Sequence, residues 1–358
     1  MINQNTDFTK WNSKESQFDK YRHIGTSLIY GRHNPEAKVS VVILSYKRIE
    51  GLKQALHSAI MQECDFPYDI LVMDDSGEIT EIDELMKGYC NQHSNIVYYR
   101  HDRNLGEPGN WNRSAEKVRT SWYCLLHDDD LMKTNYLSVM MNMANRTKGL
   151  GMIGVYVDFD DRRAKVESFG FLKKLLKLSI RLFLNLKKGK VIPLRMKDHM
   201  RDIYPISTCL FLNQKYAVEV GGSDDAYFPN SDSVFASKMS FYHAVAFVPL
   251  VLATRGVEDN QSLKQEVIDN SIKASYFHTL QMAKTLGYGE KKAIRKASLS
   301  AVIHEIMVRG YNPIDYSYIK KELNMKSIYC NKLVVEMINV YSKICWGKLL
   351  FRNGDKHE

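Results

Sequence analysis

Short apolar segments alternate with segments of helical periodicity in the first part of the chain. Four segments of six or seven residues are apolar and rich in β-branched or aromatic side chains, which predicts strands. They are VSVVILS (39–45), YDILVMD (68–74), NIVYYR (95–100) and WYCLLH (122–127). After each one, apolar residues recur every three or four positions, as they do on an amphipathic helix. This alternation predicts βαβ units, and hence an α/β fold with a mostly parallel sheet flanked by helices.

The alternation weakens after residue 150, and the pattern is helical from residue 263 almost to the end. Three later segments still predict strands. They are GMIGVYVDF (151–159), PISTCLFLN (205–213) and AVAFVPLVL (244–252). We therefore expect a polar N-terminal arm (1–38), an α/β domain (39–262) and a C-terminal helical subdomain (263–358).

Polar residues gather where the four strands end, at Ser45-Tyr46, Asp74-Asp75, 101–104 and 128–130. The carboxyl ends of parallel strands meet at one edge of a sheet, where ligands bind in folds of this kind. Residues 128–130 are three consecutive aspartates. Such a triplet can cap the next helix as an Asp-rich turn, or it can hold a hard cation such as Mg²⁺ or Mn²⁺. The convergence of polar strand ends favours the cation site.

Charge and composition narrow the class of protein. The formal charge of +9 is moderately basic, but no nucleic-acid motif accompanies it. The six cysteines have no C-x-x-C pair and no disulfide-like spacing, which predicts reduced thiols and a cytoplasmic location. The N-terminus lacks an apolar signal-peptide core. The longest nearly apolar run, 244–253, is about half of the ~20 residues that cross a bilayer.

Four motifs, in this order and at these spacings, resemble the nucleotide-sugar domain of the inverting family 2 glycosyltransferases. They are VSVVILSYKR, DILVMDDS, RNLGEPGNWNRS and LLHDDDLM. The resemblance covers about 39–262 and is strongest up to residue 137. It implies a Rossmann-like GT-A fold, with a nucleotide-sugar half (39–137) and an acceptor half (151–262). It also implies a UDP-, GDP- or dTDP-sugar donor, an Mn²⁺ or Mg²⁺ cofactor, and a hydroxyl acceptor on a glycan.

The resemblance assigns the ends of the first two strands to the nucleotide. Ser45 and Tyr46 would border the base with Arg48 nearby, and Asp75 would accept a hydrogen bond from the base. In the following loop, the motif implies the nucleotide-binding residues Asn104, Gly106 and Asn112, with Asn110 as an alternative to Asn112.

In the aspartate triplet, the family pattern implies that Asp128 faces the ribose and the waters of the metal, while Asp130 ligates the metal. Asp129 is a third candidate ligand. His127 stands where relatives often have an aspartate, so the resemblance leaves open which two acids bind the metal.

GGSDDAYFPNSDSVFASKM resembles the acceptor segment of the family, and it makes Asp232 the candidate catalytic base. An inverting transfer needs a carboxylate that removes the proton of the attacking hydroxyl. Asp232 could instead only cap the helix that follows. Asp224 and Asp225 are the alternative bases.

TRGVEDNQS resembles a further family element in which Arg255 would clamp the diphosphate. Asn260 and Ser262 fit this element. Val257, however, stands where relatives often carry a histidine that helps hold the metal or the diphosphate. Arg255 could otherwise be a surface residue on an edge strand.

Residues 169–190, FGFLKKLLKLSIRLFLNLKKGK, combine apolar positions at helical spacing with basic residues and no acid. A basic amphipathic helix of this kind can lie on an anionic membrane surface, or it can pack on the core. The membrane interpretation predicts a peripheral protein on the inner face of a bacterial cell membrane, with a lipid-linked or surface glycan as acceptor.

Two other functions fit parts of the pattern. A non-catalytic nucleotide-sugar or glycan-binding module would explain Val257 and His127, but it would not be expected to keep all the acidic candidates. A nucleotidyltransferase would be expected to have a Gly-rich basic loop after the first strand, and SYKRIEGLKQ does not provide one.

Overall fold

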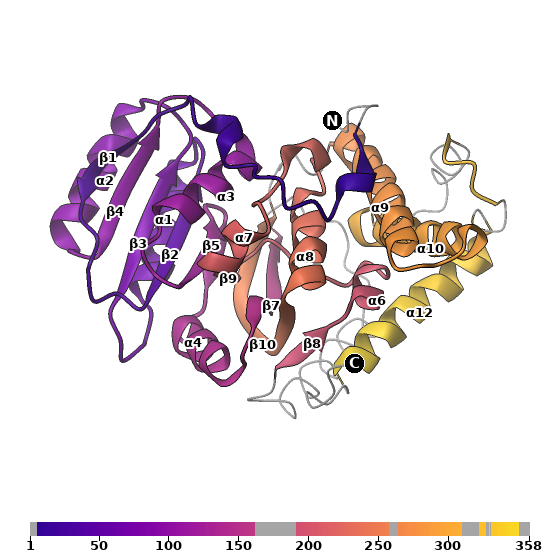
Figure 1. Cartoon of the computed structure of the whole chain (residues 1–358). Helices are drawn as coiled ribbons and strands as arrows, with labels where there is room; N and C mark the ends of the chain where they lie inside the picture. The colour runs from indigo at the N-terminus through magenta and orange to yellow at the C-terminus, as the bar shows by residue number, and fades with distance from the viewer. Residues whose placement is uncertain are drawn as a thin grey trace.

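The computed structural model describes residues 6–161, 191–257, 264–309, 322–326, 329 and 331–350. Within these residues a ten-stranded sheet forms the centre, helices cover both of its faces, and a further group of helices lies at the C-terminal end (Figure 1). The basic amphipathic segment 169–190, together with Asn260 and Ser262, lies outside the described residues. None of the described helices combines the length and the apolarity needed to span a bilayer.

Four neighbouring parallel strands form the first half of the sheet, in the order β4-β3-β2-β5. They are β2 (Val39–Ser45), β3 (Tyr68–Asp74), β4 (Ile96–His101) and β5 (Trp122–His127). The helices that connect and follow them are α1 (Ile49–Ile60), α2 (Thr80–Gln92), α3 (Gly106–Lys117) and α4 (Tyr136–Arg146). The predicted βαβ alternation is thereby confirmed.

Both faces of this half are apolar, which explains the nearly continuous apolar strands. On β2, Val41 and Ile43 point into one core with α1, α2 and α4. Val42 and Leu44 point into a second core with α3 and with α8 (Ser231–Tyr242). Successive side chains of a strand alternate between its faces, so a strand buried on both sides needs apolar residues at almost every position.

The second half of the sheet is mixed. The parallel pair β7 (Leu150–Asp161) and β10 (Ala244–Val257) is joined to β5 by β9 (Leu210–Asn213), which runs antiparallel to both of its neighbours. Two three-residue strands, β6 (Asp130–Met132) and β8 (Ile192–Leu194), pair antiparallel with β10. These two strands were not predicted, because three residues are too few to show a periodicity. Three short helical elements, α6 (Met196–His199), α7 (Gln214–Glu219) and η3 (Asp225–Tyr227), lie between the strands of this half.

The N-terminal arm contributes to the sheet and to the contact with the C-terminal helices. It contains two short 3₁₀ turns, η1 (Phe8–Lys10) and η2 (Asp19–Tyr21), and the edge strand β1 (Thr26–Gly31), which pairs antiparallel with β4. Trp11, only 1% exposed, lies edge-on against Phe241 of α8 and His278 of the C-terminal helices. The arm therefore spans the molecule from one edge of the sheet to the helical end (Figure 1).

The C-terminal region is helical, as predicted. It consists of α9 (Gln265–Thr285), α10 (Glu290–Arg309) and α12 (Lys332–Leu350) among the described residues. Ile272 and Ala297 belong to the apolar contact between α9 and α10. Val302 and Ile338 belong to the contact between α10 and α12.

Candidate active site

The ends of β2, β3 and β5 meet through backbone contacts, as the parallel arrangement requires. The carbonyl of Ser45 accepts a hydrogen bond from the Asp75 N–H at 2.9 Å. The N–H of Tyr46 donates to Asp128 Oδ2 at 2.8 Å. Ser45 is buried, and its hydroxyl has no hydrogen-bond partner among the described residues, whereas the Tyr46 ring is exposed. Ser45 and Tyr46, which are predicted to border the nucleotide base, thus lie at the same edge of the sheet as Asp128.

Asp75 binds the start of α3. Its carboxylate accepts hydrogen bonds from the N–H groups of Leu105 at 2.6 Å and Gly106 at 3.0 Å. The Asn104 side chain also accepts from the Gly106 N–H, at 3.0 Å, and donates to the Asp75 carbonyl. Burial raises the pKa of Asp75 to about 7, although the two N–H groups oppose the rise. The structure therefore brings together three residues that the sequence predicts to bind the nucleotide sugar, namely Asp75, Asn104 and Gly106.

Arg48 contacts two acids of the triplet. Its Nη1 lies 2.7 Å from Asp129 Oδ2 and 3.6 Å from Asp128 Oδ1. Burial raises the pKa of Asp128 to about 6, while the Tyr46 N–H and Arg48 favour the carboxylate. The guanidinium thus offsets part of the mutual repulsion of the triplet.

Asp130 is held from the opposite side by β10. Asp130 is paired with Arg255 in the antiparallel strands β6 and β10. Its Oδ1 accepts a hydrogen bond from the Gly256 N–H at 3.2 Å. A Cβ on residue 256 would lie 2.1 Å from the Asp129 carbonyl oxygen, so only glycine fits there. Burial raises the pKa of Asp130, and His127 and Arg255 counteract the rise. Arg255 is therefore beside the triplet, although its residue type alone could not distinguish this position from an ordinary edge strand.

The triplet offers oxygen donors that suit a hard divalent cation. Such ions are commonly held by one or two carboxylates together with waters and substrate phosphates. Within the described residues, no group of three or more His, Cys, Asp or Glu side chains is arranged to enclose an ion. The donor set therefore fits an ion shared with a diphosphate, and it does not fit a cage made by the protein alone. Asp128 and Asp130 are buried carboxylates whose raised pKa values a cation would lower.

Glu107, which the sequence motifs did not single out, lies close to His127. Glu107, in the first turn of α3, lies with Oε1 3.7 Å from His127 Nε2. Burial opposes a charge on His127, but Glu107 and the aspartates of the triplet raise its pKa. Glu107 directly follows Gly106 of the NLG motif. Nothing local in the sequence shows that its charge acts on both His127 and Asp232.

Asp232 lies in the first turn of α8. Its Oδ1 accepts from the Ser233 N–H at 2.7 Å. Burial and the charge of Glu107 raise the pKa of Asp232 to about 6, while Arg255 and His304 favour its ionised form. Charged residues of α3, β10 and α10 therefore all influence the pKa of Asp232. His304, on α10, was not selected from the sequence, because its proximity depends on how the C-terminal helices dock.

The alternative bases are engaged elsewhere. Asp225 contacts Lys20 and Tyr21 of the N-terminal arm. Asp224 caps the η3 turn by accepting from the Ala226 N–H at 2.9 Å. The contacts of Asp225 tie the N-terminal arm to the η3 turn, whereas Arg255 favours the ionised form of Asp232.

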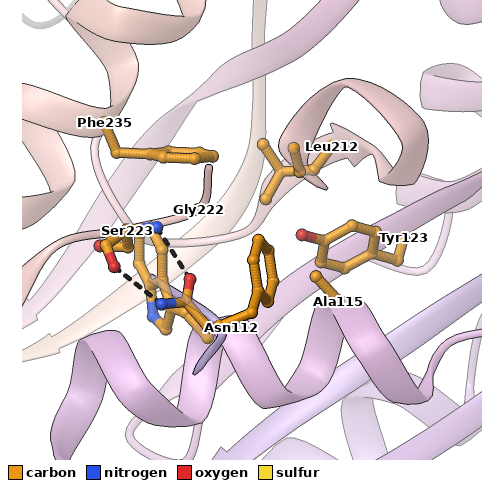
Figure 2. Close-up of a pocket in the computed structure, with 10 residues that line it drawn as sticks. Asn112, Ala115, Tyr123, Leu212, Gly222, Ser223 and Phe235 are labelled. Atoms are coloured by element: carbon orange, nitrogen blue, oxygen red, sulfur yellow. Dashed lines mark hydrogen bonds between the residues drawn. The ribbon is translucent and has the colours of Figure 1, made fainter. Parts of the chain in front are cut away.

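Asn112 connects α3 to the glycine turn before η3 (Figure 2). Its side chain donates to the Ser223 carbonyl at 2.7 Å and accepts from the Ser223 N–H at 2.8 Å. The cavity beside this contact measures about 10 Å³, close to the space of a single water, and it is walled by apolar side chains such as Phe235 and Leu212. The structure thus places Asn112, predicted as a nucleotide ligand, at a junction between the two halves of the domain. Asn110 supports the neighbouring strands by donating to the Met73 carbonyl at 3.1 Å.

Comparison with known proteins finds a family match for the first part of the sheet domain. Residues 40–195 match the family described as Glycosyl transferase family 2. The chain carries a family 2 glycosyltransferase domain. This match confirms the resemblance of the strand-end motifs. It ends at residue 195 and therefore does not include Asp232 or Arg255.

Two curated relatives are named as glycosyltransferases. An uncharacterised glycosyltransferase of Rickettsia bellii is 28% identical over 133 residues, 37% of this chain and 19% of the relative. One of Methanocaldococcus jannaschii is 25% identical over 130 residues, 36% of this chain and 44% of the relative. The chain thus spans less than half the length of these two curated relatives.

Two solved structures share the fold of the glycosyltransferase domain. TarS residues 1–349 of S. aureus, solved in complex with UDP-GlcNAc, match with a TM-score of 0.58 at 10% identity, covering 88% of this chain and 90% of TarS. The mannosyltransferase PcManGT of Pyrobaculum calidifontis, in complex with GDP-Man and Mn²⁺, matches with a TM-score of 0.50 at 11% identity, covering 88% and 91%. The predicted GT-A class is confirmed.

Proposed function

We propose that this protein is a metal-dependent inverting glycosyltransferase that moves a sugar from a nucleoside-diphosphate sugar to a hydroxyl group. The observation that carries the proposal is the arrangement of acids in the family 2 domain. Asp75 and the triplet lie at the strand ends, and the pKa of Asp232, in the first turn of α8, responds to the charges of Glu107 and Arg255. Such a site has separate groups for the donor and for proton removal.

On the donor side, Ser45, Tyr46 and Asp75 would hold the base. Asp130 and Asp128 would hold Mn²⁺ or Mg²⁺ together with the diphosphate, and Asp129 would remain paired with Arg48. When bound, the ion supplies positive charge to the departing diphosphate. TarS and the mannosyltransferase, solved with UDP-GlcNAc and with GDP-Man, support a UDP- or GDP-sugar as donor.

On the acceptor side, Asp232 would act as the general base. Its carboxylate takes the hydroxyl proton while that oxygen forms a bond to the anomeric carbon. The bond from this carbon to the diphosphate breaks on the opposite face, and its electron pair leaves with the diphosphate, which inverts the configuration. A pKa of about 6 suits this role, because the group is mostly ionised at neutral pH and still accepts a proton readily. Arg255 would offset the charge of the diphosphate.

We further propose a growing or lipid-linked surface glycan as acceptor, reached from the inner face of the cell membrane. The support is the basic amphipathic sequence of residues 169–190, which matches the composition of interfacial helices.

Calorimetric titration with UDP, GDP, dTDP and CMP, each with Mn²⁺ and again with EDTA, tests the donor site. We expect one diphosphate to bind only with metal. Asp130→Asn should weaken this binding strongly. Asp232→Asn should leave it intact while lowering turnover by about 10²- to 10⁴-fold. The exposed acid Asp65 supplies the control Asp65→Asn, which should behave like the wild type.

The outcomes separate the alternatives. Binding of none of the four nucleotides would favour a non-catalytic module. Near-normal turnover by Asp232→Asn would remove its assignment as the base.

A further inference from the structure

A buried histidine–aspartate pair joins the C-terminal helices to the turn after α6. His304 of α10 contacts Asp202, in the turn after α6, with Nδ1 2.8 Å from Oδ2. Each side chain of the pair is 6% exposed. On its other side, His304 Nε2 lies 2.5 Å from the Ser271 hydroxyl of α9. The imidazole therefore joins α9, α10 and the α6 turn at one point.

The same point is connected to the first turn of α8. The Ser271 carbonyl accepts a hydrogen bond from the Asn230 side chain at 3.1 Å. Asn230 is the N-cap residue of α8, and its carbonyl accepts from the Ser233 hydroxyl and from the Val234 N–H, both at 3.0 Å. Asp232 lies between these anchored residues, so the direction of its side chain depends on the contact between α8 and α9.

The pair also affects charge at Asp232. Burial disfavours the imidazolium form of His304, but Asp202, and to a lesser degree Asp232, raise the pKa of His304. Besides His304, Asp232 is faced by Glu107 from α3, Arg255 from β10 and Tyr204 from the loop before β9. A positive His304 therefore adds to Arg255 and opposes Glu107.

Asp202 adopts an unusual backbone conformation for this contact. Its φ of +59° lies in the left-handed region, which costs a non-glycine residue energy and is best tolerated by Asn and Asp. An Asp202→Asn variant should therefore keep the backbone while removing the charge that stabilises the imidazolium.

We propose that His304 and Asp202 are positioning residues for the catalytic base. They anchor the first turn of α8 through Ser271 and Asn230, and Asp202 stabilises the imidazolium form of His304, whose charge favours the Asp232 carboxylate. The inference deepens the proposed function and rests on it. The C-terminal helices would accordingly be part of the catalytic unit and not only a support for it.

The experiment compares the pH dependence of sugar-nucleotide turnover in three variants of the full chain. Turnover is measured as release of UDP from UDP-GlcNAc or of GDP from GDP-mannose, whichever donor binds, with water as acceptor. His304→Gln keeps a side chain that can hydrogen-bond but removes the charge, and Asp202→Asn removes its partner. The control is His278→Gln. His278 is buried on α9, and burial lowers its pKa to about 3, so it carries no charge at neutral pH.

Both His304→Gln and Asp202→Asn should lower kcat about 10-fold or more, with little change in KM for the donor. The acid limb of their pH profiles should move up by about one unit, because Asp232 loses a cation that favours its ionised form. His278→Gln should keep the wild-type profile, even if its thermal unfolding temperature falls.

Acid limbs that stay in place in both variants, with only the unfolding temperature lowered, would overturn the inference. If Asp232→Asn abolishes turnover and His304→Gln does not alter it, this inference fails alone. If the wild type binds no nucleoside diphosphate, or if Asp232→Asn is fully active, the proposed function fails and the inference fails with it.

Discussion

At the scale of single residues, the site consists of carboxylates kept out of water. Burial raises the pKa of Asp75 to about 7 and those of Asp128 and Asp232 to about 6. A carboxylate held in this way stabilises the fold least when it is ionised, because its charged form has lost hydration. Hydrogen bonds from backbone N–H groups and the charge of Arg48 offset part of this lost hydration.

The raised pKa of Asp232 predicts the pH dependence of catalysis. A general base acts only when it is ionised, so kcat should fall about tenfold per pH unit below pH 6. Measuring kcat at saturating donor separates this effect from weaker nucleotide binding when Asp128 becomes protonated. The residual activity of Asp232→Asn should lack the acid limb. The same limb in wild type and variant would assign it to another group.

At the scale of elements, the contact between α3 and the glycine turn sets the spacing of the two halves. Asn112 uses both ends of its amide on Ser223, and a Cβ on Gly222 would lie 2.5 Å from Asn112 Oδ1. Figure 2 shows Phe235 of α8 over the same junction. Because α3 carries Glu107 and α8 carries Asp232, this contact influences the distance between these two acids.

Two glycine substitutions test this junction. Gly77 and Gly222 have nearly equal φ values of +76° and +77°, but a Cβ on Gly77 would meet nothing within 4 Å. Gly77→Ala should cost only the conformational strain, about 1–2 kcal/mol of unfolding free energy. Gly222→Ala should cost a further ~1–3 kcal/mol, because the Asn112 hydrogen bonds must break. Urea unfolding measures the free energy of unfolding of both variants. An equal decrease in both would show that the Asn112–Ser223 contact adjusts to the added methyl group without loss of stability.

At the scale of the whole molecule, the N-terminal arm packs against both α8 and the C-terminal helix α9. Trp11 packs against Phe241 and His278, and its indole N–H lies 3.3 Å from the Thr285 hydroxyl of α9. The arm also adds β1 to the opposite edge of the sheet. Segments from both ends of the described chain thus determine how α8 and α9 meet.

Removing the Trp11 side chain should therefore weaken the fold. Trp11→Ala should lower the free energy of unfolding by about 3–5 kcal/mol, since the indole is nearly fully buried. The exposed Leu28, 50% accessible on β1, gives the control Leu28→Ala, which should change stability by less than about 0.5 kcal/mol. Chemical denaturation provides the comparison. Equal effects would mean that the arm is not structurally coupled to the helices.

The sequence by itself determined the α/β alternation, the limits of β2, β3 and β5, and the acidic strand ends. These features follow from local periodicity and from the rule that parallel strands end at one edge. The family match over residues 40–195 supports the resemblance. The roles of the individual site residues, on both the donor and the acceptor side, remain predictions.

Only the tertiary structure decided which distant residues meet. Gly256 donates to Asp130 across 126 positions, and Asp202 contacts His304 across 102. Neither pair lies in a periodic pattern, because each contact depends on how separately formed elements dock. Short strands such as β6 also form only once β10 offers a partner. Local spacing therefore specifies elements and strand ends, and packing specifies the environment that tunes the acids of the site.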